Sequence, residues 1–280
     1  MLASLDRERS LALDLARSCG ALALSYQTGG LLATRDKPND EGPVTRADTE
    51  VNARILDALR RAFPDDDVIG EESSAAVTGA SRCWYVDPID GTTEFARGED
   101  EWAVQIGLCI DGEPVLGVVH EAGAGRLAWG QCWRGELAGE LLVGDQRVPL
   151  RTRDATLAGL RLVSSKSHAS PKIREVMHAL AIADDRNLRI GSMGVKMTAV
   201  ARGVADLYVH ATRGTKLWDV CAPHVVLLAA GGQVSDVRGQ PLRYDPRHLG
   251  NDHGLLATQG SRHRDIVAAL APVVANWTWT

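Results

Sequence analysis

The chain has 280 residues, 45% of them hydrophobic and 24% charged, and its net charge is −5. This length and apolar content suffice for a substantial core, in one large or two medium domains. The charge balance excludes a broad basic surface for a nucleic acid polymer, so any phosphate recognition must be local.

Cysteine usage and apolar runs bear on the cellular compartment. The 5 cysteines are scattered without a CxxC pair, which indicates reduced thiols rather than a disulfide framework or a zinc site. The N-terminus becomes charged within a few residues and lacks a signal-peptide pattern. The longest apolar run, Val225 to Ala230, is far shorter than the roughly 20 residues of a membrane span. We therefore expect a cytoplasmic protein without a membrane segment.

Two helices are expected at the start of the chain. Residues 6–27 are mostly good helix formers, and a glycine pair follows them. Residues 46–63 carry apolar side chains at every fourth position, and Pro64 ends the pattern. Thr45 and Asp48 resemble a capping box with aspartate in place of glutamate. Asp48 would then lie in the first turn of the second helix.

Short apolar runs with turn signals between them predict strands in the next section. The predicted strands are residues 67–70, 83–86, 103–110 and 114–119, of which the last two form a hairpin. A glycine-rich section at residues 123–139 predicts turns and short strands, which end near Leu150.

The pattern changes near residue 150 to alternating strands and helices. Strands are expected at residues 160–164, 188–190 and 205–210, and helices at residues 171–180, 195–202 and 222–230. We therefore expect two domains: an α+β domain at residues 1–150, carrying most of the candidate ligands described below, and an α/β domain at residues 151–280.

The stretch DPIDGTTEF, Asp87 to Phe95, follows an apolar strand and carries two carboxylates three residues apart. Pro88 limits the freedom of the bend, and Gly91 lets the backbone approach a ligand. If a helix begins there, the backbone N–H groups that follow Asp90 can bind an anion. The same residue types also form an ordinary strand-to-helix turn, so this stretch alone leaves both interpretations open.

Two other places combine acids with apolar segments. Glu71 and Glu72 follow the apolar run at residues 67–70, and Asp219 lies between apolar neighbours. Taken singly, the glutamates fit a solvated loop and Asp219 fits a helix cap. Carboxylates at the ends of apolar segments need a partner once they are buried, which makes a shared site more credible.

Four motifs together resemble a known superfamily. They are Gly42 to Asp48, Gly70 to Ser73, Asp87 to Thr92, and Trp218 with Asp219. In this order and spacing the chain resembles the lithium-sensitive, magnesium-dependent phosphomonoesterases, which include inositol monophosphatases, fructose-1,6-bisphosphatases and 3'(2'),5'-bisphosphate nucleotidases. The resemblance covers essentially the whole chain. It implies an α/β fold with an α+β N-terminal half, arranged as a layered α-β-α-β-α sandwich of the sugar-phosphatase type.

The resemblance also implies a magnesium site. By position, roughly two or three Mg²⁺ ions would be bound by Glu71, Asp87, the carbonyl of Ile89, Asp90 and Asp219, because oxygen ligands suit this hard cation. Two such charges about 4 Å apart repel by on the order of 4 kcal/mol at an effective dielectric of about 20, so cations must neutralise them.

The same resemblance implies catalytic roles. Glu71 and Thr92 would orient a water molecule and help to deprotonate it, and Asp48 would stand behind Thr92 as its hydrogen-bond partner. The N–H groups of Gly91 and Thr92 would hold the phosphoryl group. The metals would polarise the phosphate and stabilise the leaving oxygen in an in-line displacement, without a covalent phosphoenzyme.

Candidate substrate contacts point towards a nucleotide. The glutamate at position 94 is similar to the residue found there in the bisphosphate nucleotidases, whereas inositol monophosphatases usually have asparagine at this position. Ser165 and Lys166 resemble a Ser-Arg segment of the nucleotidases, although lysine lacks the bidentate fork of arginine. Lys196 lies where the nucleotidases often carry a lysine and would hold a second phosphate, with a solvated helix lysine as the alternative. Thr212 replaces a glutamate that contacts ring hydroxyls in inositol monophosphatases.

The preferred interpretation is a Mg²⁺-dependent 3'(2'),5'-bisphosphate nucleotidase. Its substrate would be a small phosphate ester, adenosine 3',5'-bisphosphate, which it would convert to AMP and phosphate in sulfur metabolism, with inhibition by Li⁺. Inositol monophosphate and fructose 1,6-bisphosphate are the alternative substrates, and a catalytically silent phospholigand sensor is the non-enzyme alternative. We expect neither a nucleic acid polymer nor a membrane as partner, and a homodimer is compatible with this interpretation.

Overall fold

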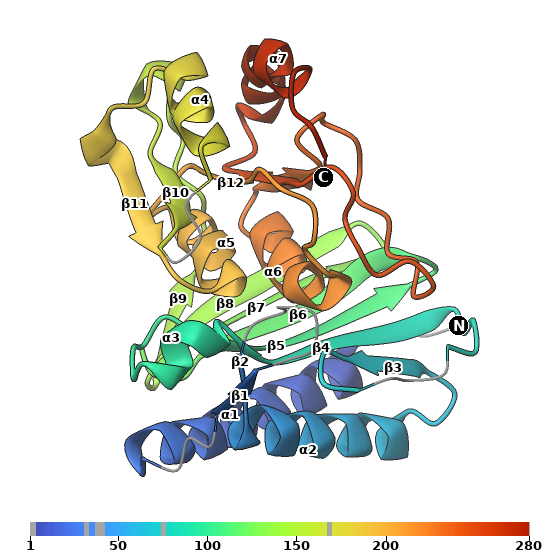
Figure 1. Cartoon of the computed structure of the whole chain (residues 1–280). Helices are drawn as coiled ribbons and strands as arrows, with labels where there is room; N and C mark the ends of the chain where they lie inside the picture. The colour runs from blue at the N-terminus through green and yellow to red at the C-terminus, as the bar shows by residue number, and fades with distance from the viewer. Residues whose placement is uncertain (1–3, 31–33, 37–42, 74–76, 167–169, 280) are drawn as a thin grey trace.

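The protein forms alternating layers of helices and sheets. The computed structural model describes residues 4–30, 34–36, 43–73, 77–166 and 170–279. Helices cover the lower face of a seven-stranded sheet, further helices lie between it and a five-stranded sheet, and a last pair of helices covers the top (Figure 1). The expected α/β class and the α-β-α-β-α sandwich are therefore confirmed.

The lowest layer consists of α1 (Asp6–Thr28) and α2 (Arg46–Ala62), which confirms both predicted helices. The apolar side chains that recur along α2 are buried against the sheet, and each such burial contributes roughly 1.5–3 kcal/mol. A small sheet of β1 (Thr34–Asp36) and β2 (Pro43–Thr45) precedes α2. The expected capping box is present, because Thr45 N donates to the Asp48 carboxylate at 2.8 Å and the Thr45 hydroxyl accepts from Asp48 N.

The larger sheet has the strand order β3-β4-β5-β6-β7-β8-β9. Its strands are β3 (Asp67–Gly70), β4 (Arg82–Asp90), β5 (Ala103–Ile110), β6 (Glu113–Glu121), β7 (Arg126–Trp133), β8 (Glu136–Val143) and β9 (Gln146–Pro149). β3 and β4 are parallel, and the other neighbours are antiparallel. The predicted strands and the β5-β6 hairpin are confirmed, but β4 continues to Asp90 instead of ending at Val86.

The turns and strands predicted at residues 123–139 are present, but β7 and β8 have 8 residues each and are longer than the short strands expected. Gly123, Gly125 and Gly135 lie in the turns, whereas Gly130 and Gly139 lie inside strands, where α6 (Leu217–Ala229) crosses the sheet. A Cβ atom at Gly117 would lie 2.1 Å from a backbone oxygen of α6, and one at Gly130 would lie 2.6 Å from another. Glycine at these positions therefore lets the helix backbone rest directly on the sheet.

The layer between the two sheets is formed by α5 (Met193–Ala201) and α6. The helix predicted at residues 195–202 is confirmed. α6 begins at Leu217, earlier than the predicted residue 222, because the side chain of Asp219 accepts a hydrogen bond from Lys216 N at 2.8 Å and stabilises the first turn. Pro223 lies inside the helix, where it lacks the N–H that would bond the Asp219 carbonyl.

The smaller sheet has the strand order β11-β10-β12-β14-β13. Its strands are β10 (Leu162–Ser165), β11 (Asn187–Ile190), β12 (Leu207–His210), β13 (Gln233–Ser235) and β14 (Leu255–Thr258). Its outer face carries α4 (Lys172–Ala179) and α7 (His263–Val274), and short 3₁₀ turns lie at Leu157–Gly159 and Asp184–Arg186. β14 and α7 were not predicted, although α7 buries apolar residues with a four-residue repeat.

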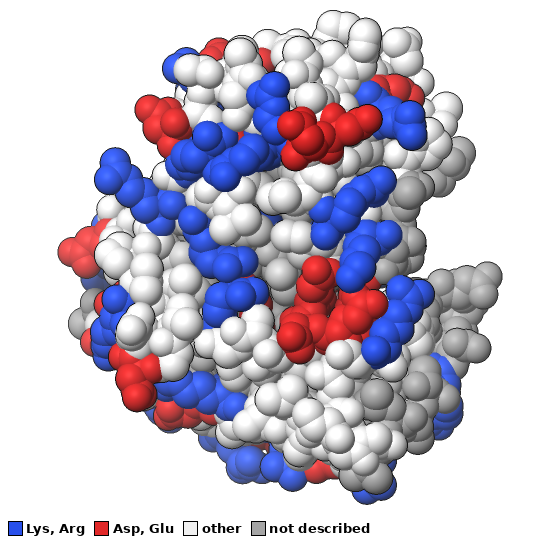
Figure 2. All heavy atoms as spheres, turned by 90° about the vertical axis from the view of Figure 1, so that its left-hand side faces the viewer, with Lys and Arg blue, Asp and Glu red and all other residues white. Residues whose placement is uncertain are grey.

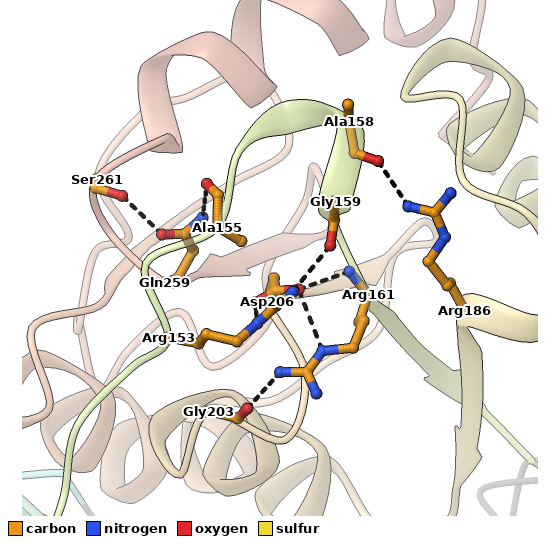
Figure 3. A network of polar contacts seen from close by, with 10 residues as sticks. All are labelled: Arg153, Ala155, Ala158, Gly159, Arg161, Arg186, Gly203, Asp206, Gln259 and Ser261. Carbon is orange, nitrogen blue, oxygen red and sulfur yellow. Dashed lines mark hydrogen bonds and ion pairs between the residues drawn. The ribbon is translucent and has the colours of Figure 1, made fainter.

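A polar network fixes the linker that enters the smaller sheet (Figure 3). Asp206 has 0% exposed surface and precedes β12. Its carboxylate accepts from Arg153 Nε at 2.9 Å and from Arg161 N at 2.6 Å. Arg153 also donates to the carbonyl of Gly159 at 2.9 Å. The buried charge is thus satisfied by the linker that it holds in place.

The two sheets divide along the sequence. The strands of the larger sheet precede residue 150 and those of the smaller sheet follow residue 161, yet α6 packs against the larger sheet. The division into domains at residues 1–150 and 151–280 stays a prediction. Within the described ranges, no helix is long and apolar enough to cross a membrane.

Candidate active site

A cavity of about 860 Å³ lies where the two halves of the chain meet. Residues from β4, α3 (Thr92–Ala96), α5, β12 and α6 line it, together with Glu71 after β3. Figure 2 views the side of the molecule that carries α3, β11 and α4, and shows acidic side chains gathered on this face with Lys and Arg side chains around them. The cavity is thus built from both halves and lined by acids on the β4 side.

The larger sheet brings the predicted acids together. Gly70 of β3 pairs with Val86 of β4 in parallel register, and Glu71 N donates to the carbonyl of Val86 at 3.1 Å. Glu71 therefore lies beside Asp87, to which its side chain is hydrogen-bonded. An irregularity between Asp87 and Asp90 shifts the β4–β5 register, which lets the two carboxylates share one region.

Burial and mutual repulsion act on this group. Asp87 is 2% exposed, and its pKa is raised well above the usual value, first by burial and then by the charges of Glu71, Asp90 and Asp219. The pKa of Asp219 is also raised, first by burial and then by Glu71 and Asp90. Glu71, Asp87, Asp90 and Asp219 are called the acid cluster below. The cluster concentrates negative charge that the fold alone leaves poorly compensated.

Asp90 joins the two halves of the molecule. Its carboxylate accepts from Ser192 Oγ at 2.5 Å, Met193 N at 3.0 Å and Gly194 N at 2.5 Å, all at the start of α5. Gln105 Nε2 on β5 also donates to it at 2.7 Å. Burial nevertheless raises the pKa of Asp90, while the donors at the start of α5 and the charge of Lys196 oppose the shift. Sequence reasoning missed Ser192 and Gln105, although the Gly-Ser turn before a helix was a signal for Ser192.

The proposed catalytic threonine contacts the proposed supporting aspartate. Thr92 Oγ1 lies 3.2 Å from Asp48 Oδ1 and 3.0 Å from the carbonyl oxygen of Ile89, and it can donate its one proton to either. Thr45 Oγ1 donates to the other oxygen of Asp48 at 2.5 Å. The α2 cap therefore fixes Asp48, and Asp48 faces Thr92. Thr45 was predicted only as a cap.

The backbone at Gly91 requires glycine. Its φ is +91°, and a Cβ atom there would lie 2.9 Å from the carbonyl oxygen of Glu101 and 3.0 Å from Ser192 Cβ. Gly91 and Thr92 line the cavity next to Glu94, which is 4% exposed. These three predicted substrate contacts therefore border the same space as the acid cluster.

The predicted lysines and Ser165 differ in their placement. Ser165 lines the cavity, whereas Lys166 Nζ pairs with Glu99 at 2.6 Å and Glu101 at 3.6 Å. Lys196 lines the cavity with 5% exposed surface. Burial lowers the pKa of Lys196 to about 8, against the attraction of Asp90 and nearby acids. Lys196 is thus a buried group, not a solvated helix lysine.

The donor chemistry of the acid cluster fits a hard divalent cation. Its carboxylates and the carbonyl of Ile89 offer oxygen atoms, which Mg²⁺ prefers, and their mutual repulsion calls for positive charge. In the described part of the chain no three acidic, imidazole or thiol side chains are positioned around one point as metal ligands. Asp90 and Asp219 instead direct oxygens to backbone N–H groups at the starts of α5 and α6.

Comparisons with curated proteins agree with the motifs. A model described as the inositol monophosphatase family matches residues 4–275. The chain is 34% identical over 242 residues to the 3'(2'),5'-bisphosphate nucleotidase CysQ of Escherichia coli O157:H7, with 84% of this chain and 92% of that protein covered. It is 29% identical over 302 residues to the human 3'(2'),5'-bisphosphate nucleotidase 1, with 93% of this chain and 92% of that protein covered.

Solved structures show the same architecture. The inositol monophosphatase from Anabaena (Nostoc) sp. PCC 7120 is 26% identical, has a TM-score of 0.74 and is matched over 96% of each chain. The Thermotoga maritima IMPase, at 22% identity, has a TM-score of 0.78 over 96% of this chain and 98% of that chain, and it supports the fold alone. The family generally uses Mg²⁺, in keeping with the oxygen donors of the acid cluster. From the family model and the relatives together, the chain belongs to the inositol monophosphatase family of phosphomonoesterases.

Proposed function

We propose that the protein is a Mg²⁺-dependent 3'(2'),5'-bisphosphate nucleotidase that converts adenosine 3',5'-bisphosphate to AMP and phosphate. The observation that carries the substrate class is the 34% identity to CysQ across 92% of that nucleotidase. The acid cluster at the edge of a single cavity supports the reaction type. This activity would place the protein in sulfur metabolism, with Li⁺ as an inhibitor.

The proposed metal ligands follow the sequence expectation. Roughly two or three Mg²⁺ ions would be held by Glu71, Asp87, the Ile89 carbonyl, Asp90 and Asp219. When bound, these ions supply positive charge that polarises the phosphate and stabilises the leaving oxygen. The donors on Asp90 fix the orientation of one ligand before any cation binds.

The chain itself would position the attacking water and the phosphate. Glu71 and Thr92 would orient the water, and Glu71 would accept its proton. Asp48 would hold the Thr92 hydroxyl in place, in keeping with their 3.2 Å contact. The N–H groups of Gly91 and Thr92 would donate to phosphoryl oxygens, which need a close backbone approach that a side chain at Gly91 would block.

The remainder of the substrate would occupy the wider part of the cavity. About 860 Å³ is within the range of ligand sites and accommodates a nucleoside bisphosphate. Glu94 and Ser165 would contact it there, and Lys166 would have to leave Glu99 to reach a second phosphate. Thr212 lines the cavity, and its hydroxyl is hydrogen-bonded to His210 Nε2 at 2.9 Å. It would therefore present a hydroxyl to the substrate where an inositol site would present a carboxylate.

The test is Mg²⁺-dependent phosphate release from adenosine 3',5'-bisphosphate, inositol 1-phosphate and fructose 1,6-bisphosphate, compared by kcat/KM. We expect the nucleotide to be preferred by at least about tenfold, which corresponds to about 1.4 kcal/mol of transition-state discrimination. A preference for inositol phosphate would refute the substrate assignment. Binding of the nucleotide without turnover would support a sensor instead.

A further inference from the structure

Residues 277–279 follow α7 and return towards the smaller sheet, where Figure 1 marks the C-terminus. Trp277 is 7% exposed and belongs to the apolar core that α4, α7 and this sheet share. Its Nε1 donates to the carboxylate of Glu175 on α4 at 2.8 Å. The Trp279 ring lies edge-on to two other rings, with centroid distances of 5.9 Å to Trp277 and 5.5 Å to His253. Aromatic contacts therefore anchor this segment.

One side of the segment contacts the start of α4. Lys172 Nζ donates to the carbonyl of Thr278 at 2.9 Å and lies 5.2 Å and 4.9 Å from the ring centroids of Trp277 and Trp279. Lys172 is not among the residues that line the substrate cavity, but the residues on both sides of it are. These contacts therefore fix the part of the cavity wall that the start of α4 provides.

The other side of the segment contacts the loop that follows β12. Arg213 Nη1 donates to the carbonyl of Trp279 at 3.4 Å, and Arg213 Nη2 donates to Asp252 Oδ1 at 2.8 Å. Arg213 lies between Thr212 and Gly214, which both line the cavity. The loop is thus held through a residue that does not line the cavity itself.

Gly254 lies close to both the Trp279 ring and the last residue of β12. Its φ is +64°, and a Cβ atom there would lie 2.2 Å from the carbonyl oxygen of His210 and 3.4 Å from a ring carbon of Trp279. Glycine at this position lets the ring and the strand approach the same backbone. Since His210 lines the cavity, only the backbone of one residue separates the indole ring from a residue of the cavity wall.

We propose that Trp279 is a positioning residue that joins two walls of the substrate cavity, the start of α4 and the loop after β12. It thereby determines how tightly the cavity holds the part of the substrate beyond the phosphate under attack. None of the Trp279 contacts described above involves the acid cluster. The inference rests on the proposed function, because it takes these two walls to hold the nucleoside portion of the substrate.

The arrangement gives the direction of the effect. Without the ring, the two walls lose their shared anchor, so more of the binding free energy is used to order them around the substrate. Inorganic phosphate is too small to reach from the acid cluster to both walls and would not require that ordering. The size of the bound molecule therefore separates this positioning role from a general disturbance of the site.

The experiment compares variants of the full chain in Mg²⁺-dependent hydrolysis of adenosine 3',5'-bisphosphate. Trp279→Ala should raise KM by about tenfold, with kcat and the inhibition constant of inorganic phosphate within about twofold of the parent values. Trp279→Phe keeps an aromatic ring and should restore most of the parent KM. Lys172→Met removes one anchor and keeps the indole ring, so it should raise KM by about threefold. This milder variant also decides the question if Trp279→Ala fails to fold.

Amide hydrogen exchange gives a second measurement that does not depend on the substrate. In Trp279→Ala, exchange at residues 210–214 should be faster than in the parent protein, because the loop after β12 loses its support. Exchange along β4, which carries two members of the acid cluster, should be unchanged.

Trp133 provides a matched control. Both Trp133 and Trp279 are partly buried, and neither indole N–H has a hydrogen-bond partner among the described residues. An arginine guanidinium lies at a similar distance from each ring centroid: Arg134 at 5.5 Å from Trp133 and Arg238 at 5.6 Å from Trp279. Trp133 ends β7 and is not among the residues that line the substrate cavity. Trp133→Ala should therefore leave KM and the exchange at residues 210–214 unchanged.

Three outcomes would overturn the proposal. They are an unchanged KM in Trp279→Ala, an equal rise of KM in Trp133→Ala, and a loss of phosphate inhibition by the same factor as the nucleotide. The last would mean that the whole site is disturbed. If the parent protein does not hydrolyse the nucleotide, the proposed substrate is refuted. Hydrogen exchange, with KM for whichever of the other two esters is hydrolysed, would then still decide the role of Trp279.

Discussion

Two buried aspartates on neighbouring parallel strands have opposite electrostatic properties. Asp67, at the start of β3, is 4% exposed and accepts from Thr78 N, Thr78 Oγ1, Gly79 N and Ala80 N at 2.8–3.2 Å. Although burial acts in the other direction, these bonds lower its pKa. Asp87, at the other end of this strand pair, has a raised pKa because of burial and like charges. Although little of either side chain is exposed, hydrogen bonds offset the charge of Asp67, whereas the deeper burial of Asp87 and the like charges around it leave its charge poorly compensated.

Asp90 lies between these extremes. It has as many protein donors as Asp67, but it belongs to the acid cluster, and burial keeps its pKa raised. The donors fix the orientation of the Asp90 carboxylate, but they do not fully offset the rise in its pKa that burial causes. The number of hydrogen bonds alone therefore does not identify a ligand, and the proximity of further acids has to be considered with it.

The largest effect is expected for Asp87→Asn. Removing a charge from the acid cluster should lower kcat/KM for Mg²⁺-dependent phosphate release by on the order of 10³-fold. The metal-free protein should keep its stability, because the substitution relieves repulsion from Glu71 and Asp219. Steady-state kinetics and thermal unfolding without Mg²⁺ measure the two effects. Activity within about tenfold of the parent protein would remove Asp87 from the proposed metal ligands.

His224 extends the comparison to a buried base. Burial lowers its pKa to about 4, and its Nδ1 lies 2.7 Å from the hydroxyl of Tyr244. The pKa of His224 in the folded state is below its value of about 6.5 in the unfolded state, so the unfolded state takes up the proton first as the pH falls. The contribution of neutral His224 to the free energy of unfolding is therefore complete above about pH 6.5 and decreases by about 3 kcal/mol as the pH falls towards 4. Urea unfolding between those pH values should show a shallower pH slope for His224→Gln. An equal slope in the variant would contradict the assignment.

Asp67→Asn should affect stability and spare catalysis. The substitution replaces one acceptor oxygen of the carboxylate with an NH₂ group, which would face N–H groups that now donate to Asp67. This loss of hydrogen bonds should lower the free energy of unfolding by about 2 kcal/mol near pH 7. Because the folded pKa of Asp67 is lowered, the stabilisation is present above the unfolded pKa and disappears as the pH falls through the folded pKa. Denaturant unfolding and kcat together test this variant. A large loss of kcat in the folded variant would abolish the contrast with Asp87.

Ser192→Ala should give the smallest change. It removes the Oγ donor to Asp90 and the cap in which Ser192 Oγ accepts from Val195 N at 3.1 Å. The expected loss is about 1 kcal/mol of stability, with a decrease in kcat/KM of less than about tenfold, because Gln105 and the backbone donors remain. If this variant were as inactive as Asp87→Asn, the hydroxyl would have a role beyond orienting Asp90.

Local sequence patterns predicted the structure correctly where short-range interactions determine it. The Thr45–Asp48 cap, the apolar repeat of α2 and the alternation of strands and helices in the second half are local, and they were predicted correctly. The need for glycine at Gly117 and Gly130 could not be predicted from the local sequence, because it comes from the backbone of α6, which is distant in the chain. The donors from Ser192 and Gln105 to Asp90 arise from the tertiary fold, across 102 and 15 residues, so no local pattern pairs either residue with Asp90.

The crossing of α6 over the glycines of the larger sheet has a consequence for synthesis. A ribosome releases the sheet strands and three members of the acid cluster long before Asp219 and the α5 turn that holds Asp90. In the nascent chain, the glycines on the face of the sheet are therefore not yet covered by α6, and the acid cluster is incomplete. Only after α6 emerges and packs on those glycines does Asp219 reach the other three acids, so the proposed metal site is completed late in translation.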